Sequence, residues 1–138
     1  MPTQNELKAL AKLRLKEAQS LHAQSLYDGA CYLGGYAIEL AFKARICKLL
    51  KVADYPEEGK LGQAFKIHKL EDLVFLAGLK AEWVDKKLSN IPFKMNSDLV
   101  FDWSEAWRYL PQDTKSQANS QDFLAAVEDI FTWIKHKW

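Results

Sequence analysis

One segment, residues 27–50, constrains the fold of this chain more than any other. It reads YDGACYLGGYAIELAFKARICKLL and predicts a helix that is apolar on nearly every side. Such a helix has to be covered by protein on several sides, so we expect it at the centre of a helical bundle and also at a subunit contact. Glu39 and Lys43 lie one helical turn apart within this segment. Burying a charged pair costs free energy, so the pair needs a structural or functional reason.

Length and composition predict one domain. The chain has 138 residues, of which 49% are hydrophobic, and this is enough for a core that buries roughly two thirds of the surface of the unfolded chain. We therefore expect one helical domain over residues 1–138. With 19 basic and 18 acidic residues the net charge is +1, so the overall charge does not favour nucleic acid or a membrane as the partner.

The N-terminal segment and the hydropathy pattern predict the compartment. The chain begins MPTQNELKALAKLRLKEA, which is amphipathic and charged, unlike a secretory signal. No run approaches the roughly 18 apolar residues of a membrane-spanning helix. The sequence therefore predicts a soluble, cytoplasmic protein with no membrane partner.

The cysteines and histidines argue against metal and covalent chemistry. Cys31 and Cys47 both fall on the apolar segment, too far apart along a helix to form a disulfide, and are expected to be reduced core residues. Thiols in such surroundings are poor nucleophiles. His22, His68 and His136 are scattered and show no spacing typical of a metal site. We expect no metal ligand and no cofactor.

The rest of the chain predicts further helices. Thr3 or Asn5 is expected to cap the first helix, and Asp28 the central one. Residues 52–66, which contain Gly, Pro and alternating charges, predict a long loop. Hydrophobic periodicity places the other helical segments at about residues 5–24, 69–77, 80–88 and 93–103, and from about residue 116 onward. No strand-like alternation occurs, so the fold class is all-α.

Small residues on the central helix predict a close helix contact. Ala30, Gly34, Ala37 and Ala41 recur at steps of three or four residues and form a smooth stripe. Gly34 and Gly35 each cost about 1 kcal/mol relative to Ala inside a helix. Close packing of a neighbouring element against the stripe is the expected compensation.

The pair Glu39 and Lys43 supports two interpretations, a structural polar network or a ligand-binding or catalytic pocket. Its neighbours on the helix are mostly apolar or aromatic, so full exposure to solvent is not expected. A partly buried pair recruits further hydrogen-bond partners. His68, Arg108 or Tyr109 could supply them.

Residues 103–111, WSEAWRYLP, form the aromatic-rich segment of the chain. Aromatic side chains at this density are usually anchors of a core or an interface. Aromatic faces beside Arg108 also suit a nucleobase or a phosphate. The sequence leaves both interpretations open.

Three segments together resemble the HEPN domain family (higher eukaryotes and prokaryotes nucleotide-binding), in its compact prokaryotic form. They are YDGACYLGGYAIELAFKARIC, FKIHKLEDL and WSEAWRYLP, and the likeness is strongest in GYAIELAFKA at residues 35–44. The resemblance implies an up-and-down bundle of four to five helices with short extra helices. It also implies a homodimer, a nucleotidyltransferase partner protein and a place in a toxin–antitoxin type system.

Ribonucleases of this family share an arginine followed, after four to six residues, by a histidine. No pair in this chain has that spacing. Arg14 and His22 are separated by seven residues. Arg45 and Arg108 are followed by no histidine within the required distance. The usual constellation for metal-independent RNA cleavage is therefore absent.

The leading hypothesis is a HEPN-like nucleotide- or RNA-binding accessory protein, without catalytic residues. Its candidate ligand-binding residues are Glu39, Lys43, His68, Arg108 and Tyr109. The alternative is a divergent metal-independent endoribonuclease, a toxin. It would use Arg108 or Arg14 to stabilise the phosphate and His68 or His22 as acid or base. A third possibility is a scaffold whose surface recognises another protein.

Overall fold

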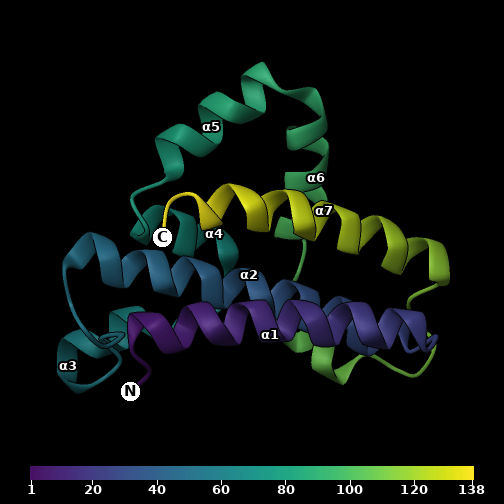
Figure 1. Ribbon diagram of the computed structural model, residues 1–138, viewed down its shortest axis with the longest axis horizontal. Coiled ribbons are helices and arrows are strands. Elements are labelled where there is room, and N and C mark those ends of the chain that lie inside the picture. The colour runs from purple at the N-terminus through teal and green to yellow at the C-terminus, as the bar shows by residue number, and fades with distance from the viewer.

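The structure is a computed structural model that describes all residues from 1 to 138, and it consists of helices joined by loops (Figure 1). Seven α-helices are present: α1 (Gln4–Ala23), α2 (Tyr27–Leu50), α3 (Gly59–Gly62), α4 (Leu70–Leu76), α5 (Lys80–Ser89), α6 (Ile91–Phe101) and α7 (Gln117–Lys135). Two 3-10 helices, η1 (Gln63–Phe65) and η2 (Glu105–Tyr109), complete the elements. The only extended pairing is an isolated bridge between Thr3 and Asp54. The all-α bundle expected from the sequence is confirmed.

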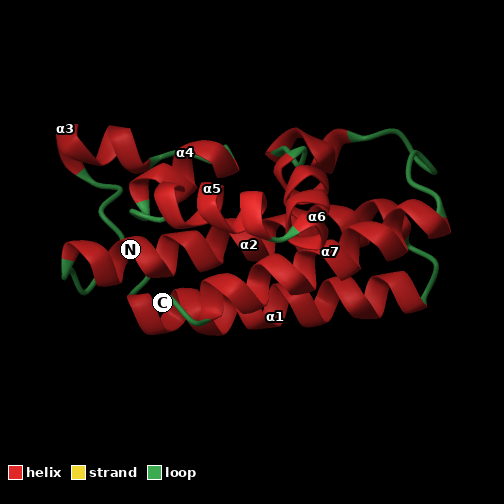
Figure 2. Cartoon of the chain, turned by 90° about the horizontal axis from the view of Figure 1, so that it is seen from above, coloured by secondary structure: helices red, strands yellow, loops and turns green.

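Three long helices form the body of the molecule. α1 and α2 are antiparallel neighbours, and α7 runs beside α2 in the same direction as α2 (Figure 1). The hairpin of α5 and α6 stands away from this body, and α6 returns to pack on α7. Seen from above, α2 lies between α1 on one side and α4 on the other (Figure 2). None of the helices combines the length and the apolar character needed to cross a bilayer.

The central position of α2 is confirmed. Every residue from Gly34 to Cys47 is buried except Tyr36 and Arg45, which are partly buried. The cover comes from α1, α7, α4 and η2 of the same chain. A subunit contact on α2 is therefore not needed to explain why this helix is apolar on nearly every side.

Local capping explains where the first helix begins but not where the second begins. The Thr3 side chain accepts a hydrogen bond from the backbone N–H of Glu6, whose carboxylate accepts from the Thr3 N–H, so Thr3 caps α1. The prediction that Asp28 caps α2 is wrong, because α2 begins at Tyr27 and Asp28 lies inside its first turn. Its carboxylate accepts hydrogen bonds from the backbone N–H of Lys115 (2.6 Å) and Thr114 (3.3 Å). Asp28 therefore fixes the loop that precedes α7.

The predicted loop at residues 52–66 is more ordered than the sequence indicated. It contains α3 and η1, and Tyr55 within it is fully buried. The Tyr55 hydroxyl donates a hydrogen bond of 2.9 Å to the Phe65 carbonyl. The segment is therefore a compact cap that folds back onto α2.

The two adjacent glycines of α2 allow the close contacts predicted from the small-residue stripe. A Cβ atom on Gly34 would lie 2.8 Å from Leu124 on α7. A Cβ atom on Gly35 would lie 2.0 Å from the indole of Trp103, which donates a hydrogen bond of 3.1 Å to the Tyr32 carbonyl. Trp103 precedes η2, so Gly35 sets how closely this segment approaches α2.

Replacing Gly35 by Ala is expected to lower the free energy of unfolding by about 2 kcal/mol or more. Displacing a packed indole costs more than the roughly 1 kcal/mol gained in helix propensity. Urea denaturation monitored by tryptophan fluorescence measures the change. Gly29→Ala in the same helix is the control, since its Cβ would meet only the tip of Leu21 at 3.3 Å. A Gly35→Ala protein as stable as the control would contradict this packing argument.

Candidate functional site

A charged pair lies in the interior of the molecule. Glu39 and Lys43 occupy successive turns of α2, with side chains that are 1% and 7% exposed. Lys43 Nζ is 3.0 Å from Glu39 Oε1. Removing two charges from water costs several kcal/mol per ion unless other groups compensate. The surrounding side chains therefore decide whether the pair is tolerated.

Residues of the 52–66 segment surround Lys43. Its ammonium group lies 3.4 Å from the carboxylate of Glu57 and 5.1 Å from the centre of the Tyr55 ring. The aromatic face and the second carboxylate both attract the ammonium group of Lys43. The folded cap thus supplies the compensation that the interior of α2 lacks.

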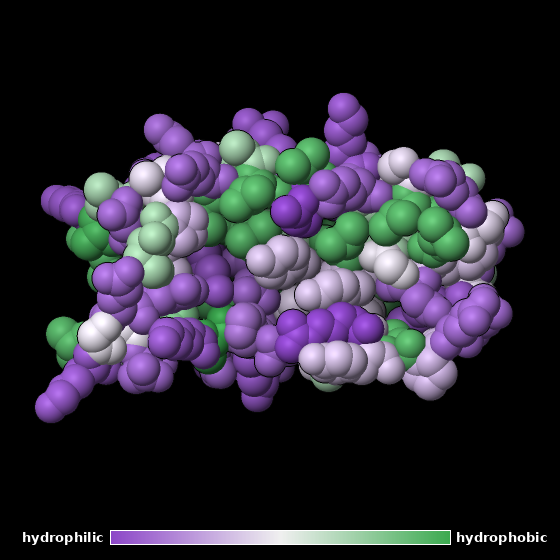
Figure 3. All heavy atoms as spheres, turned by 90° about the horizontal axis from the view of Figure 1, so that it is seen from below, coloured by the Kyte–Doolittle hydropathy of each residue, from purple (hydrophilic) through white to green (hydrophobic).

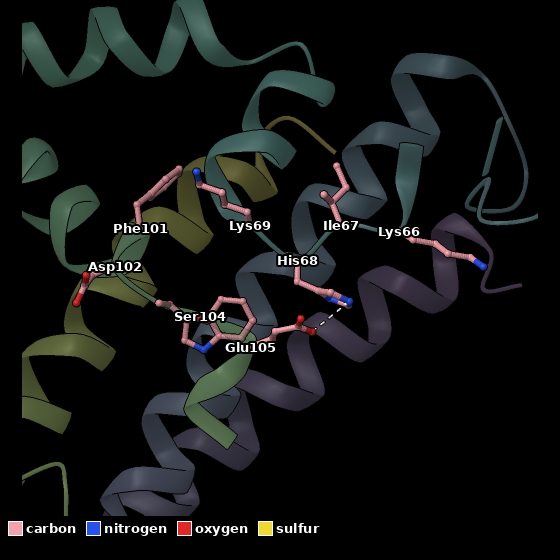
Figure 4. Close-up of a pocket in the computed structure, with 9 residues that line it drawn as sticks. Lys66, Ile67, His68, Lys69, Phe101, Asp102, Ser104 and Glu105 are labelled. Carbon is pink, nitrogen blue, oxygen red and sulfur yellow. Dashed lines mark ion pairs between the residues drawn. The ribbon is translucent and has the colours of Figure 1, made fainter. Parts of the chain in front are cut away.

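His68 continues the network toward the surface. Its Nδ1 lies 3.0 Å from Glu39 Oε1, and its Nε2 lies 3.2 Å from Glu105 Oε2. A neutral imidazole donates from one nitrogen only, so both contacts are hydrogen bonds only when the ring carries two protons. Figure 4 shows His68 pointing toward Glu105, with the ion pair marked. His68 therefore joins the buried acid of α2 to η2.

One atom of this network has no partner. Glu39 Oε2 is buried and accepts no hydrogen bond from any protein group. An unsatisfied buried acceptor costs about 1–3 kcal/mol, more when it is charged. This oxygen is the point at which a further donor would stabilise the network.

A cavity of about 560 Å³ opens beside His68. Its walls are residues 66–69 of the segment before α4 and residues 101–105, from the end of α6 to the start of η2 (Figure 4). Lys66 and Lys69 lie in the first wall, and Asp102 and Glu105 lie in the second. The two walls therefore carry residues of opposite charge, although the Lys66 ammonium and the Asp102 carboxylate point away from His68 and Glu105 (Figure 4).

The structure brings together three of the five predicted site residues, Glu39, Lys43 and His68, and leaves two outside. The Arg108 guanidinium packs 4.9 Å from the centre of the Tyr109 ring, and Tyr109 is 76% exposed. Neither residue forms a hydrogen bond or ion pair with the buried network. Both belong to η2, which lies on the lower side of Figure 1. Seen from below, this face of the molecule mixes hydrophilic residues, residues of intermediate hydropathy and apolar residues (Figure 3). The Tyr109 hydroxyl raises the pKa of Arg108.

The residues of the alternative ribonuclease hypothesis have other partners. Arg14 forms an ion pair of 2.8 Å with Glu17. His22 Nδ1 lies 2.8 Å from the hydroxyl of Ser120 on α7. The two side chains are therefore held by different elements and do not form one site.

The cysteines are buried and free, as expected. Burial raises the pKa of the Cys31 thiol and of the Cys47 thiol. Both groups are therefore poor nucleophiles.

Glu57, Tyr55 and Glu105 belong to the network but were not predicted. Each lies outside the long helices, in a segment without hydrophobic periodicity. Glu105 lies in the aromatic-rich segment 103–111 that the sequence analysis singled out, but the signal there came from the aromatic residues and Arg108. The partners of the buried pair could not be found from the pattern of α2 alone.

Comparison with known proteins identifies the family. A family model described as the HEPN domain matches residues 5–137. The chain belongs to the HEPN family. The resemblance inferred from three short segments is thereby confirmed over nearly the whole chain. No curated protein and no solved structure matches the chain significantly.

Membership in the HEPN family indicates a function related to nucleotides or RNA. The features of this member are the buried pair of Glu39 and Lys43, the bridging His68 and the adjoining cavity. The network uses carboxylates, an ammonium and an imidazole. No arginine takes part in it.

Replacing Lys43 by Met is expected to lower the free energy of unfolding by about 3–5 kcal/mol, because it leaves the Glu39 carboxylate buried without its closest cation. Adding Glu39→Gln removes that charge and should recover part of the loss. Chemical denaturation of both variants measures the difference. Arg14→Met is the control, since it removes a more exposed ion pair and should cost below about 1 kcal/mol. A double variant less stable than Lys43→Met would contradict this account.

Stability is expected to fall at alkaline pH, in part through Tyr55. Burial, followed by the carboxylates of Glu57 and Glu39, raises the pKa of Tyr55 above its ordinary value of 10.0. When a group has a higher pKa in the folded protein than in the unfolded chain, it lowers the folding stability as the pH rises above its pKa in the unfolded chain. Below that pH the group does not change the folding stability. Tyr55→Phe should flatten this decline and cost about 1 kcal/mol near neutral pH, through loss of the hydrogen bond to Phe65.

Denaturation midpoints between pH 7 and pH 11 measure both effects of the Tyr55→Phe change. Tyr109→Phe is the matched control, because that side chain is 76% exposed. The control should follow the wild-type curve. An unchanged alkaline decline in Tyr55→Phe would show that Tyr55 does not contribute to it.

Proposed function

We propose that this HEPN-family chain is a nucleotide- or RNA-binding accessory protein whose ligand occupies the cavity between residues 66–69 and 101–105. The observation that carries the proposal is the His68 bridge. His68 contacts the buried carboxylate of Glu39, whose other oxygen, Oε2, has no hydrogen-bond partner. His68 also lines the wall of an open cavity, so it links this carboxylate to the cavity. Buried polar networks with an unmet group are typical of binding sites.

The charges of the cavity fit the two ends of a nucleotide. Lys69, and Lys66 once its exposed side chain turns toward the cavity, would offer ammonium groups to phosphate oxygens. Asp102 and Glu105 would repel phosphate, but their carboxylates accept hydrogen bonds from hydroxyl or amino groups, such as those of a ribose or a base. A ligand with phosphate at one end and donors at the other matches this arrangement.

Binding of a nucleotide or RNA without cleavage is better supported than RNA cleavage. RNA cleavage requires a cation placed to stabilise the charged phosphate in the transition state, close to an acid or base. Arg108 packs on Tyr109 and Arg14 pairs with Glu17. Neither is in contact with His68. His68 itself contacts carboxylates through both ring nitrogens.

The proposal includes a protein partner. This partner would be a nucleotidyltransferase, in a toxin–antitoxin type system, as the sequence resemblance to the family implies. Arg108 and the exposed ring of Tyr109 on η2 are candidate contacts either for this protein or for RNA that extends beyond the cavity.

Nucleotides or short RNAs are expected to raise the melting temperature of the protein. Replacing both Lys66 and Lys69 by Ala should weaken binding about tenfold or more, since two charge-assisted contacts to phosphate are lost. Isothermal titration calorimetry measures the affinity. The matched control replaces Lys16 and Lys135 by Ala, two exposed lysines remote from the cavity.

Two results would count against the proposal. One is the absence of stabilisation by any nucleotide or RNA, together with no partner protein recovered by affinity purification. The other is cleavage of total RNA that is lost in His68→Ala, which would make the protein a divergent endoribonuclease.

A further inference from the structure

One polar contact holds the two walls of the cavity together. His68, from the segment before α4, places Nε2 at 3.2 Å from Oε2 of Glu105, the first residue of η2. Figure 4 marks this ion pair between the two side chains. No other ion pair or hydrogen bond joins residues 66–69 to residues 101–105. Loss of this contact would therefore free the two walls to move apart.

The inner nitrogen of His68 is fixed, whereas the outer nitrogen is accessible. Nδ1 lies 3.0 Å from Oε1 of Glu39, which is buried and paired with Lys43. This contact orients the ring so that Nε2 faces the cavity. The side chains of His68 and Glu105 are 43% and 41% exposed, so small solutes reach the pair. Exposed ion pairs are weak, and a competing anion therefore displaces Glu105 at little cost.

We infer that His68 Nε2 is the group that binds the phosphate of the ligand, and that Glu105 occupies this position in the free protein as an internal substitute for phosphate. A carboxylate and a phosphate both present oxygen acceptors to an N–H donor, and a protonated imidazole attracts either of them. The inference rests on the proposed function, because it assumes a ligand with a phosphate in this cavity. It adds that the Glu105 carboxylate inhibits binding until the ligand displaces it.

The surroundings of His68 favour phosphate over Glu105. A phosphate group carries more than one negative charge and several acceptor oxygens, so it can accept from His68 and from Lys69 at the same time. Both residues line the same wall of the cavity. The nearest carboxylate to the Lys69 ammonium is that of Glu71, at 3.9 Å. Lys69 is therefore available for the second contact, which Glu105 does not make.

Displacement of Glu105 also frees an acceptor on the opposite wall. The released carboxylate can accept a hydrogen bond from a hydroxyl or amino group of the same ligand. A nucleotide then replaces one direct contact between the walls by two contacts of its own, one to each wall. A nucleoside has no anion with which to displace Glu105. The exchange of partners at His68 therefore selects nucleotides over nucleosides.

The test is titration of the full chain with inorganic phosphate, AMP and adenosine, followed by NMR at the backbone amides of residues 66–69. At about pH 6.5 an unperturbed imidazole is about half protonated. Glu105→Gln removes the competing charge but keeps the shape of the side chain. It should bind inorganic phosphate about fivefold more tightly than the wild type, because a competing ion pair is lost. Adenosine should show no such gain.

A cycle of variants shows whether the gain acts through His68. His68→Gln should weaken the binding of phosphate and AMP about tenfold, and Glu105→Gln added to it should no longer tighten binding. Glu82→Gln is the matched control. It also removes one carboxylate from an ion pair, that with Lys137 at 2.7 Å, outside the cavity, and should bind phosphate like the wild type. Circular dichroism verifies that every variant is folded.

The outcomes separate this inference from the proposed function. A wild type that binds AMP, together with a Glu105→Gln protein that binds phosphate no more tightly, would overturn the inference alone. A gain that persists in the absence of His68 would also overturn it, because Glu105 would then act on some other group. If no nucleotide or RNA binds the wild type or Glu105→Gln, the proposed function fails as well.

Discussion

The structure depends on the burial of one carboxylate, that of Glu39, inside an apolar helix. A buried charge is tolerated only where opposite charges and hydrogen-bond donors surround it. Lys43 comes from the same helix, but His68 has to be brought by a segment far along the chain. The need to compensate this charge therefore couples α2 to the segments that precede α4 and to η2.

The same coupling creates the cavity. Residues 66–69 and 101–105 approach each other because His68 reaches Glu39 and Trp103 packs on Gly35. The cavity is lined by loop residues held on a rigid helix, which is the usual arrangement of binding sites in folded domains.

Sequence reasoning succeeded where the signal is local and periodic. The five longer helices begin within two residues of their predicted starts, α1, α2, α5 and α6 also end within two residues of their predicted ends, and the central helix was recognised from its composition. It was wrong for Asp28, which binds the loop before α7 instead of capping α2. It also took residues 52–66 as a plain loop, although Tyr55 there is buried against α2. Contacts between distant segments decided both cases.

The sequence by itself determined the helical class, the family, the central place of α2 and the burial of the Glu39 and Lys43 pair. The family follows from the resemblance of three motif segments, and the other three follow from composition and periodicity, which act over a few turns of helix. The tertiary structure alone decided that His68, and neither Arg108 nor Tyr109, completes the network, and that Glu57 and Glu105 join it. Such partners meet only after loops close around the bundle. No spacing along the chain encodes that closure.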